Sequence, residues 1–227
     1  MNKQEPLLWI SQYVHDLLQQ KFGQELNHCE AFLGGRYLVV FVRGFVSAME
    51  GVLLRQGQLD KVANARAMVM ESLITEYKTY LKLQLALSVD EFYQDWSYEN
   101  NTGVIIALLK EEQEHPEPPG DWRGLDGLED EVNRISHIIE QTPRLTTVVP
   151  LTPRVLIVQR DGILILLEKV MIAKGYVKEL RATKADVEKD YFHHQANFTA
   201  MVGRELEDLF VDWNFESDRS IMCLMWK

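Results

Sequence analysis

Apolar residues recur at helical spacing in two stretches of the first hundred residues. One stripe begins after Pro6 and ends before Gly23, and its members are Ile10, Tyr13, Val14, Leu17 and Leu18. The other begins after Gly57, and its members are Leu59, Val62, Val69, Met70, Leu73, Ile74, Tyr77 and Leu81. This spacing predicts two amphipathic helices, the second of them long. Because each has one apolar face, we expect both to cover a sheet.

β-Branched and aromatic runs between these helices predict strands. The run Tyr37–Val42 predicts a buried strand, and the weaker stretch His28–Phe32 is expected to be its hairpin partner. Further along, Ser47 and Glu50 stand three residues apart in a capping-box pattern. This pattern predicts a short helix that ends at about Arg55.

A second hairpin is predicted after the long helix. Phe92–Tyr98 alternates in polarity, and the turn residues Asn100–Gly103 separate it from the apolar run Val104–Leu109. The order of elements in this half is therefore αββααββ. Strands and helices grouped in this way predict an α+β fold, with an antiparallel sheet covered by helices on one face.

The composition changes at residue 111. Residues 111–124 hold three prolines and several glutamates without apolar periodicity, which is typical of an extended linker. We therefore expect a first domain over residues 1–110 and a second over residues 125–227.

The second half repeats residues of the first at a nearly constant offset. Arg36, Leu38, Val40, Gly44, Glu50, Val52 and Gly57 recur 118 positions later as Arg154, Leu156, Val158, Gly162, Glu168, Val170 and Gly175. Asp95, Trp96, Glu99 and Lys110 recur 117 positions later as Asp212, Trp213, Glu216 and Lys227. These matches predict two tandem copies of one αββααββ unit.

The two copies differ where the short helix begins. Ile165 replaces Ser47, which removes the capping box, and the stretch Ile163–Leu167 is more apolar than its counterpart. The extra apolar surface predicts that the second copy buries an additional face, most simply against the first copy as an intrachain pseudo-dimer. Further homo-oligomerisation stays open.

Net charge and cysteine usage narrow the class of partner and the compartment. A formal charge of −10 and a pI near 5.1 argue against nucleic acid or an anionic lipid surface as the main partner, while leaving room for a small basic patch. Only Cys29 and Cys223 are present, which suits a reduced compartment, although a disulfide between them stays open. Without a secretory signal or a spanning apolar run, we expect a cytoplasmic protein with no membrane span.

Two carboxylate pairs are the first candidate sites. If strand alternation continues through both sequences, Asp95 and Glu99 share one face, and Asp212 and Glu216 share the same face in the second copy. Each pair would then be available to a cation or to the basic groups of a partner. The alternative is a solvated face, with the neighbouring tryptophans anchoring the core.

Arg43, at a strand end, is the other candidate ligand-binding residue. It would bind a phosphate or carboxylate, and the alternative is a salt bridge to one of the many acidic side chains. No catalytic residue, cofactor or metal site is predicted. His193 and His194 are adjacent and would diverge by about 100° on a helix, and His28 with Glu30 lacks a third ligand.

Short segments of the first half carry a family resemblance. Residues 42–50 read Val-Arg-Gly-Phe-Val-Ser-Ala-Met-Glu, residues 53–57 read Leu-Leu-Arg-Gln-Gly, and residues 91–96 read Glu-Phe-Tyr-Gln-Asp-Trp. This pattern resembles the bacterial family named after MpsC, the C component of a sodium-translocating, membrane-potential-generating system. The second half keeps Asp-Trp but has Gln159–Gly162 in place of the Arg-Gly segment. The resemblance implies a cytoplasmic accessory protein linked to inorganic-carbon or sodium-coupled membrane transport, with no known catalytic residues.

Two functions from different classes follow. The first is a non-enzymatic accessory or interaction protein that binds a protein partner, such as a membrane transport component. The second is a sensor that binds a small anionic metabolite or nucleotide between the copies through Arg43, Arg36 and Arg154. An enzyme comes third, because no phosphate loop, nucleophile elbow or Cys-x-x-Cys pair occurs. An exposed apolar patch would favour the partner, and converging arginines would favour the sensor.

Overall fold

The protein is an α+β protein with two antiparallel sheets, as the sequence predicts. The computed structural model describes residues 5–114 and 122–227. The chain divides into two compact units, one that comprises nearly all of the residues before the undescribed segment and one that follows it. Each unit has its own sheet and its own helix-covered core.

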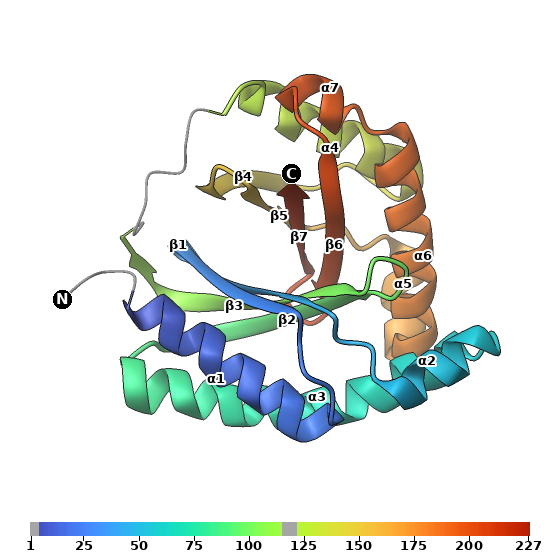
Figure 1. Cartoon of the computed structure of the whole chain (residues 1–227). Helices are drawn as coiled ribbons and strands as arrows, with labels where there is room; N and C mark the ends of the chain where they lie inside the picture. The colour runs from blue at the N-terminus through green and yellow to red at the C-terminus, as the bar shows by residue number, and fades with distance from the viewer. Residues whose placement is uncertain (1–4, 115–121) are drawn as a thin grey trace. The chain divides into compact units, whose positions relative to one another are not determined.

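The first unit contains a three-stranded sheet in the order β1-β3-β2. Its elements are α1 (Glu5–Phe22), β1 (His28–Arg43), α2 (Ala48–Arg55), α3 (Leu59–Leu85), β2 (Val89–Ser97) and β3 (Thr102–Gln113). β1 pairs antiparallel with β3 from Tyr37 opposite Leu108 to Arg43 opposite Thr102. α1 and α3 lie along this sheet (Figure 1).

The hairpin expected around Gly34 and Gly35 is instead a single long strand. β1 runs without interruption from His28 to Arg43. Gly35 has a φ of +55°, and the register with β3 shifts between Gly35 and Tyr37. Glycine at positive φ with such a shift is typical of a β-bulge, which bends a strand without reversing it. The prediction of a separate His28–Phe32 strand is therefore wrong.

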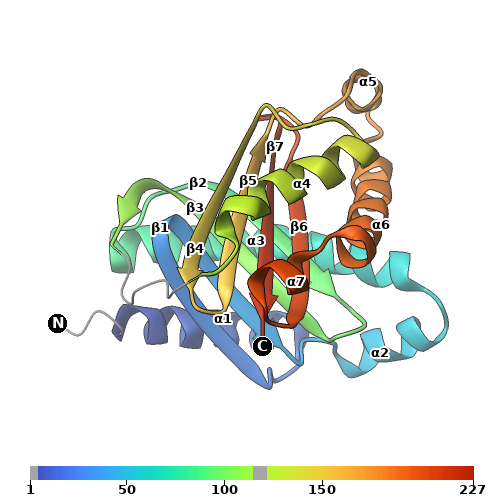
Figure 2. The same ribbon diagram turned by 90° about the horizontal axis from the view of Figure 1, so that it is seen from above.

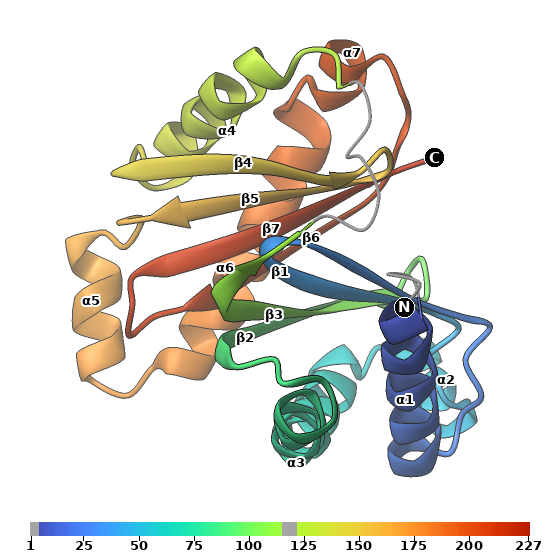
Figure 3. The ribbon, with the colours of Figure 1, turned by 90° about the vertical axis from the view of Figure 1, so that its left-hand side faces the viewer.

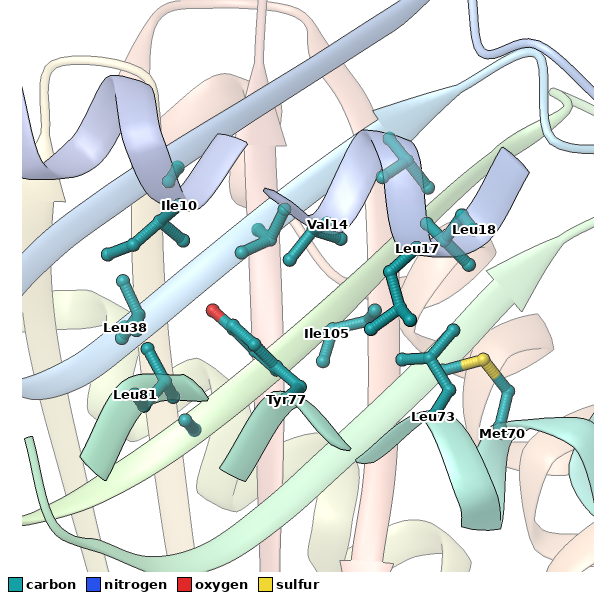
Figure 4. Packing of buried hydrophobic residues seen from close by; sticks show 14 of the residues in the cluster. Ile10, Val14, Leu17, Leu18, Leu38, Met70, Leu73, Tyr77, Leu81 and Ile105 are labelled. Carbon is teal, nitrogen blue, oxygen red and sulfur yellow. The ribbon is translucent and has the colours of Figure 1, made fainter. Parts of the chain in front are cut away.

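Helices α1 and α3 cover the same face of this sheet (Figure 3). Ile10, Val14 and Leu17 from α1 and Leu73, Tyr77 and Leu81 from α3 meet strand residues that include Leu38 and Ile105, as Figure 4 shows. Every one of these side chains is at most 5% exposed. Most members of the predicted stripes thus build this core, whereas Leu59 at the start of α3 is exposed.

The second unit contains a four-stranded sheet in the order β4-β5-β7-β6 (Figure 2). Its elements are α4 (Leu125–Ile139), β4 (Leu145–Thr152), β5 (Val155–Asp161), α5 (Leu166–Ala173), α6 (Val177–Gln195), α7 (Phe198–Val202), β6 (Leu206–Asn214) and β7 (Arg219–Trp226). Its core joins residues of α4, α6 and α7 to β5, β6 and β7.

Two details of the second unit depart from the sequence analysis. Pro150, a residue type typical of loops, lies in β4, opposite Leu156. Proline lacks an N–H donor and is tolerated because β4 is an edge strand. The predicted linker also shortens: β3 extends to Gln113, Trp122 is buried in the second core, and residues 115–121 lie outside the described residues.

Candidate functional site

The predicted carboxylate pairs do not share a strand face. Asp95 lies on β2, which ends at Ser97, so Glu99 falls in the following turn, where it is exposed. Asp212 lies on β6, which ends at Asn214, and Glu216 is likewise exposed in the next turn. The alternation extrapolated from the sequence fails because both strands end before the second carboxylate.

Asp212 is already engaged within the second unit. Its side chain is 14% exposed and forms an ion pair with Arg181, which also donates to the carbonyl of Trp213 at 2.8 Å. Burial raises the pKa of Asp212, and Arg181 opposes that shift. The exposed carboxylates Glu99 and Glu216 are therefore more accessible to a partner than Asp212 is.

The arginines named for an anion-binding site are held by their own units. Arg36 donates from Nε to the Leu109 carbonyl at 2.7 Å and lies 3.4 Å from Asp90. Arg154 donates to the Trp226 carbonyl at 3.1 Å and pairs with Glu207 at 3.0 Å. Arg43, at the end of β1, lies over the Phe41 ring at 5.3 Å. These contacts give the sensor hypothesis no support.

A buried arginine that the sequence analysis missed lies in the first unit. Arg66 on α3 is 1% exposed and donates to both carboxylate oxygens of Glu50, at 2.6 and 2.8 Å. Its guanidinium also lies over the rings of Phe22, Phe45 and Trp96, at 4.0, 4.4 and 4.7 Å. Burial lowers the pKa of Arg66, and Glu50 opposes that shift.

The same Glu50 caps α2. Its carboxylate accepts from the Ser47 N–H at 2.8 Å, and the Ser47 hydroxyl accepts from the Glu50 N–H at 3.3 Å, which confirms the predicted capping box. Glu50 therefore fixes the start of α2 and ties it to Arg66 on α3.

The second unit holds a larger buried charge cluster. Arg160 on β5 and Glu188 on α6 form an ion pair with both side chains at most 1% exposed. Arg160 also donates to the hydroxyls of Ser220 and Ser136, at 2.8 and 3.1 Å. Glu188 accepts from the Trp213 indole N–H at 2.8 Å. Every charged group in this pair thus has further hydrogen bonds, which a buried ion pair requires.

Lys184 connects this cluster to two other helices. Its ammonium pairs with Glu140 at the end of α4, with Glu168 on α5 at 2.8 Å, and with Glu188 at 3.4 Å. Glu168 in turn accepts from the Ile165 N–H at 2.9 Å. Half of the capping box therefore persists although Ile165 has no side-chain acceptor.

A sequence signal for these buried charges exists. Arg66 stands four residues from Val62 and from Met70, and Lys184 and Glu188 stand between Leu180 and Phe192 at the same spacing. Charges at i and i+4 of an apolar stripe lie on its buried face. A stripe defined by apolar residues alone does not include these charged positions.

Charge imbalance in the cluster perturbs proton binding. Burial and the neighbouring Glu188 carboxylate raise the pKa of Glu140 to about 8, and Lys184 opposes the shift. Burial also opposes ionisation of Glu188, but Arg160 and Lys184 outweigh it and hold the pKa of Glu188 below its ordinary value. The cluster therefore holds one proton more readily on Glu140 than on Glu188.

This arrangement predicts how Glu140 affects stability. The pKa of Glu140 is about 8 in the folded protein, above the ordinary value of 4.5. Its protonated form therefore contributes fully to the free energy of unfolding at pH below 4.5, and this contribution is lost as the pH rises towards 8. We expect Glu140→Gln, which mimics the protonated form, to gain stability relative to wild type by up to about 1.4 kcal/mol per pH unit over that range. Urea unfolding at several pH values measures this. Glu129→Gln, at an exposed position of α4, is the control, and parallel curves for wild type and Glu140→Gln would contradict the prediction.

Short helices α2 and α5 expose apolar side chains. In α2, Met49 is 76% exposed and Val52 is 45% exposed, and no residue of this helix is buried. In α5, Leu166 and Leu167 are 78% and 65% exposed, and the one buried residue is Glu168. Exposed apolar groups of this kind mark interaction surfaces.

Three further findings concern membrane spans, metal sites and cysteines in the described residues. No helix in residues 5–114 or 122–227 is both long and apolar enough to cross a membrane. The same residues contain no group of three His, Cys, Asp or Glu side chains that could hold a metal ion. Cys29 and Cys223 are free thiols, so the disulfide left open by the sequence is not formed. Burial raises the pKa of Cys29 to about 12.

The first half of the chain matches a known protein family. Neither the curated proteins nor the solved structures contain a significant match to the chain. Residues 3–111, which span the first unit, match the family described as the Na+-translocating membrane potential-generating system (MpsC), so this half of the chain is similar to that family.

Proposed function

We propose that the protein is a non-enzymatic accessory protein that acts at the cytoplasmic side of an ion-translocating membrane system by binding one of its components. The match of residues 3–111 to a family described by such a system carries this proposal. The matched half contains α2, whose exposed Met49 and Val52 offer a contact surface. A protein partner suits this surface, since its apolar side chains would be buried on association.

The two exposed turn carboxylates offer a second mode of contact. Glu99 and Glu216 occupy corresponding hairpin turns and are open to solvent. A partner that presents basic loops would bind them through charge, and salt would weaken such an association. Contact through Met49 and Val52 would instead depend little on salt.

Affinity purification from membranes of the native cells tests the proposal. We expect the tagged chain to recover a membrane-embedded component of an ion-translocating system. Met49→Ser with Val52→Ser should lower its recovery at least several-fold if α2 is the contact. If Glu99 and Glu216 are the contact, Glu99→Lys with Glu216→Lys should lower the recovery at least several-fold, and high salt should lower the recovery as well. Leu8→Ser with Leu83→Ser removes apolar side chains of α1 and α3 that are 67% and 70% exposed and is the matched control. Recovery of no membrane component, or equal loss in the control, would refute the proposal.

We also propose that the two units are copies of one module. Gly44 and Gly162 both have positive φ, at +80° and +73°, and donate to the carbonyls of Asn101 and Asp218 at 2.8 and 2.7 Å. Asn101 and Asp218 have nearly equal φ values, +53° and +52°. Backbone positions of this rarity at matching offsets support a common origin.

The buried ion pairs add support from the side chains. Arg66 with Glu50 and Lys184 with Glu168 stand 118 positions apart and tie the short helix to the long helix in each unit. At the positions of Arg160 and Glu188, the first unit has Val42 and Met70, both fully buried. In this proposal, the second copy exchanged an apolar contact for an ion pair at the same place.

A further inference from the structure

Helix α5 has an inverted polarity. Its eight residues include five large apolar side chains, yet the residue that it buries is Glu168. Leu166 and Leu167 project with most of their surface exposed, and Val170 is 41% exposed. An ordinary surface helix turns its apolar face to the core, whereas most of the apolar surface of α5 lies outside the core of its own unit.

The start of α6 extends this surface. Tyr176 and Val177 follow α5 after Lys174 and Gly175, and both are exposed. We call Leu166, Leu167, Val170, Tyr176 and Val177 the α5 patch. The high exposure of its leucines means that they protrude and do not line a groove.

Lysines surround the α5 patch in a chain that is otherwise strongly acidic. Lys169, Lys174 and Lys178 are all exposed. Lys169 lies 3.2 Å from Asp218, whereas no described residue forms an ion pair with Lys174 or Lys178. Glu179 is the acidic residue next to Lys178. Because salt limits electrostatic reach to about 8 Å at physiological ionic strength, these local charges outweigh the distant acidic surface.

The corresponding part of the first unit has different residues at these positions. The positions 118 residues before the three lysines hold Gly51, Gln56 and Asp60. Ala48 stands where the second unit has the most exposed leucine, Leu166. The first unit also exposes Met49, Val52 and Leu59 there, with Arg55 and Lys61 nearby, so the second unit is distinguished by Leu166 and by its three lysines.

We propose that the α5 patch docks on an anionic lipid bilayer, with its apolar side chains in the interface and the lysines against lipid headgroups. Protruding apolar residues beside basic ones fit a bilayer interface, and a tyrosine suits the headgroup level. Lysine is depleted at the core of protein interfaces, so the lysines around the α5 patch favour a bilayer over a protein partner. Glu168, held by Lys184, orients the helix so that these side chains face outward.

Vesicle co-sedimentation of the full chain tests this docking. Vesicles of phosphatidylcholine with an equal part of phosphatidylglycerol should bind it, and vesicles of phosphatidylcholine alone should bind it far less. Replacing Lys169, Lys174 and Lys178 with glutamine should weaken binding on the order of 100-fold. Leu166→Ser with Leu167→Ser should weaken it about 10-fold or more.

Matched variants keep the test specific. Lys78→Gln, Lys82→Gln and Leu83→Ser change exposed residues of α3 and should leave vesicle binding unchanged. An unchanged urea midpoint shows that the leucine variant folds. Absence of binding to anionic vesicles would overturn the proposal. So would equal loss in the α3 variant, binding of a soluble acidic peptide in place of vesicles, or self-association that Leu166→Ser with Leu167→Ser abolishes.

Discussion

Replacing Arg160 with valine is expected to lower the free energy of unfolding of the second unit by about 3–5 kcal/mol. The substitution leaves Glu188 as a buried carboxylate whose nearest remaining cation is Lys184, at 3.4 Å. It also removes the donors to Ser136 and Ser220, both of which are buried. Equilibrium unfolding in urea, followed by far-ultraviolet circular dichroism, measures the loss.

The double variant Arg160→Val with Glu188→Met tests whether the loss comes from the orphaned charge. These residues are the ones that the first unit has 118 positions earlier, Val42 and Met70. Because replacing a whole buried ion pair by apolar groups is often neutral, we expect the double variant to recover most of the stability. A remaining deficit of about 1–3 kcal/mol is expected from the Trp213 indole N–H, which loses its acceptor. Additive losses from the two single variants would contradict this account.

Arg66→Ala is expected to destabilise the first unit by about 3–5 kcal/mol, because it leaves Glu50 without its cation. It also opens space among the rings of Phe22, Phe45 and Trp96, which the guanidinium contacts. The start of α2 should loosen as well, since Glu50 caps it. Urea unfolding and hydrogen exchange of the α2 amides measure both effects.

Arg66→Lys is the matched comparison. The second unit has Lys184 at the corresponding position, paired with Glu168, so an ammonium can fill this role. Lysine keeps the charge but cannot form the two-pronged contact or stack on the rings in the same way. We therefore expect an intermediate loss. A loss as large as that of alanine would show that stacking, and not charge, holds the site.

Prediction from the sequence succeeded where local periodicity coincides with burial. The stripes of α1 and α3, the capping box at Ser47 and the strand formed by Val104–Leu109 all follow from residues close together in the chain. Propensity and pattern act over such distances. The α+β class followed from the order of these elements.

The errors arose where a partner elsewhere in the unit decides the outcome. Gly35 permits either a turn or a bulge, and only pairing with β3 selects the bulge. Pro150 reads as a loop residue until its edge position in the sheet is known. Strand alternation would place Asp95 and Glu99 on one face, but β2 ends at Ser97, before Glu99.

The sequence by itself determined the helices, most strands and the acidic character of this protein, because each depends on neighbouring residues or on composition. Only the tertiary structure decided which charges are buried. Arg66 and Glu50 are 16 residues apart, and Arg160 and Glu188 are 28 apart, so each pair meets only after the chain has folded back on itself. Exposure of the α5 patch was decided in the same way, since Lys184 from the next helix holds Glu168 and leaves the leucines outside.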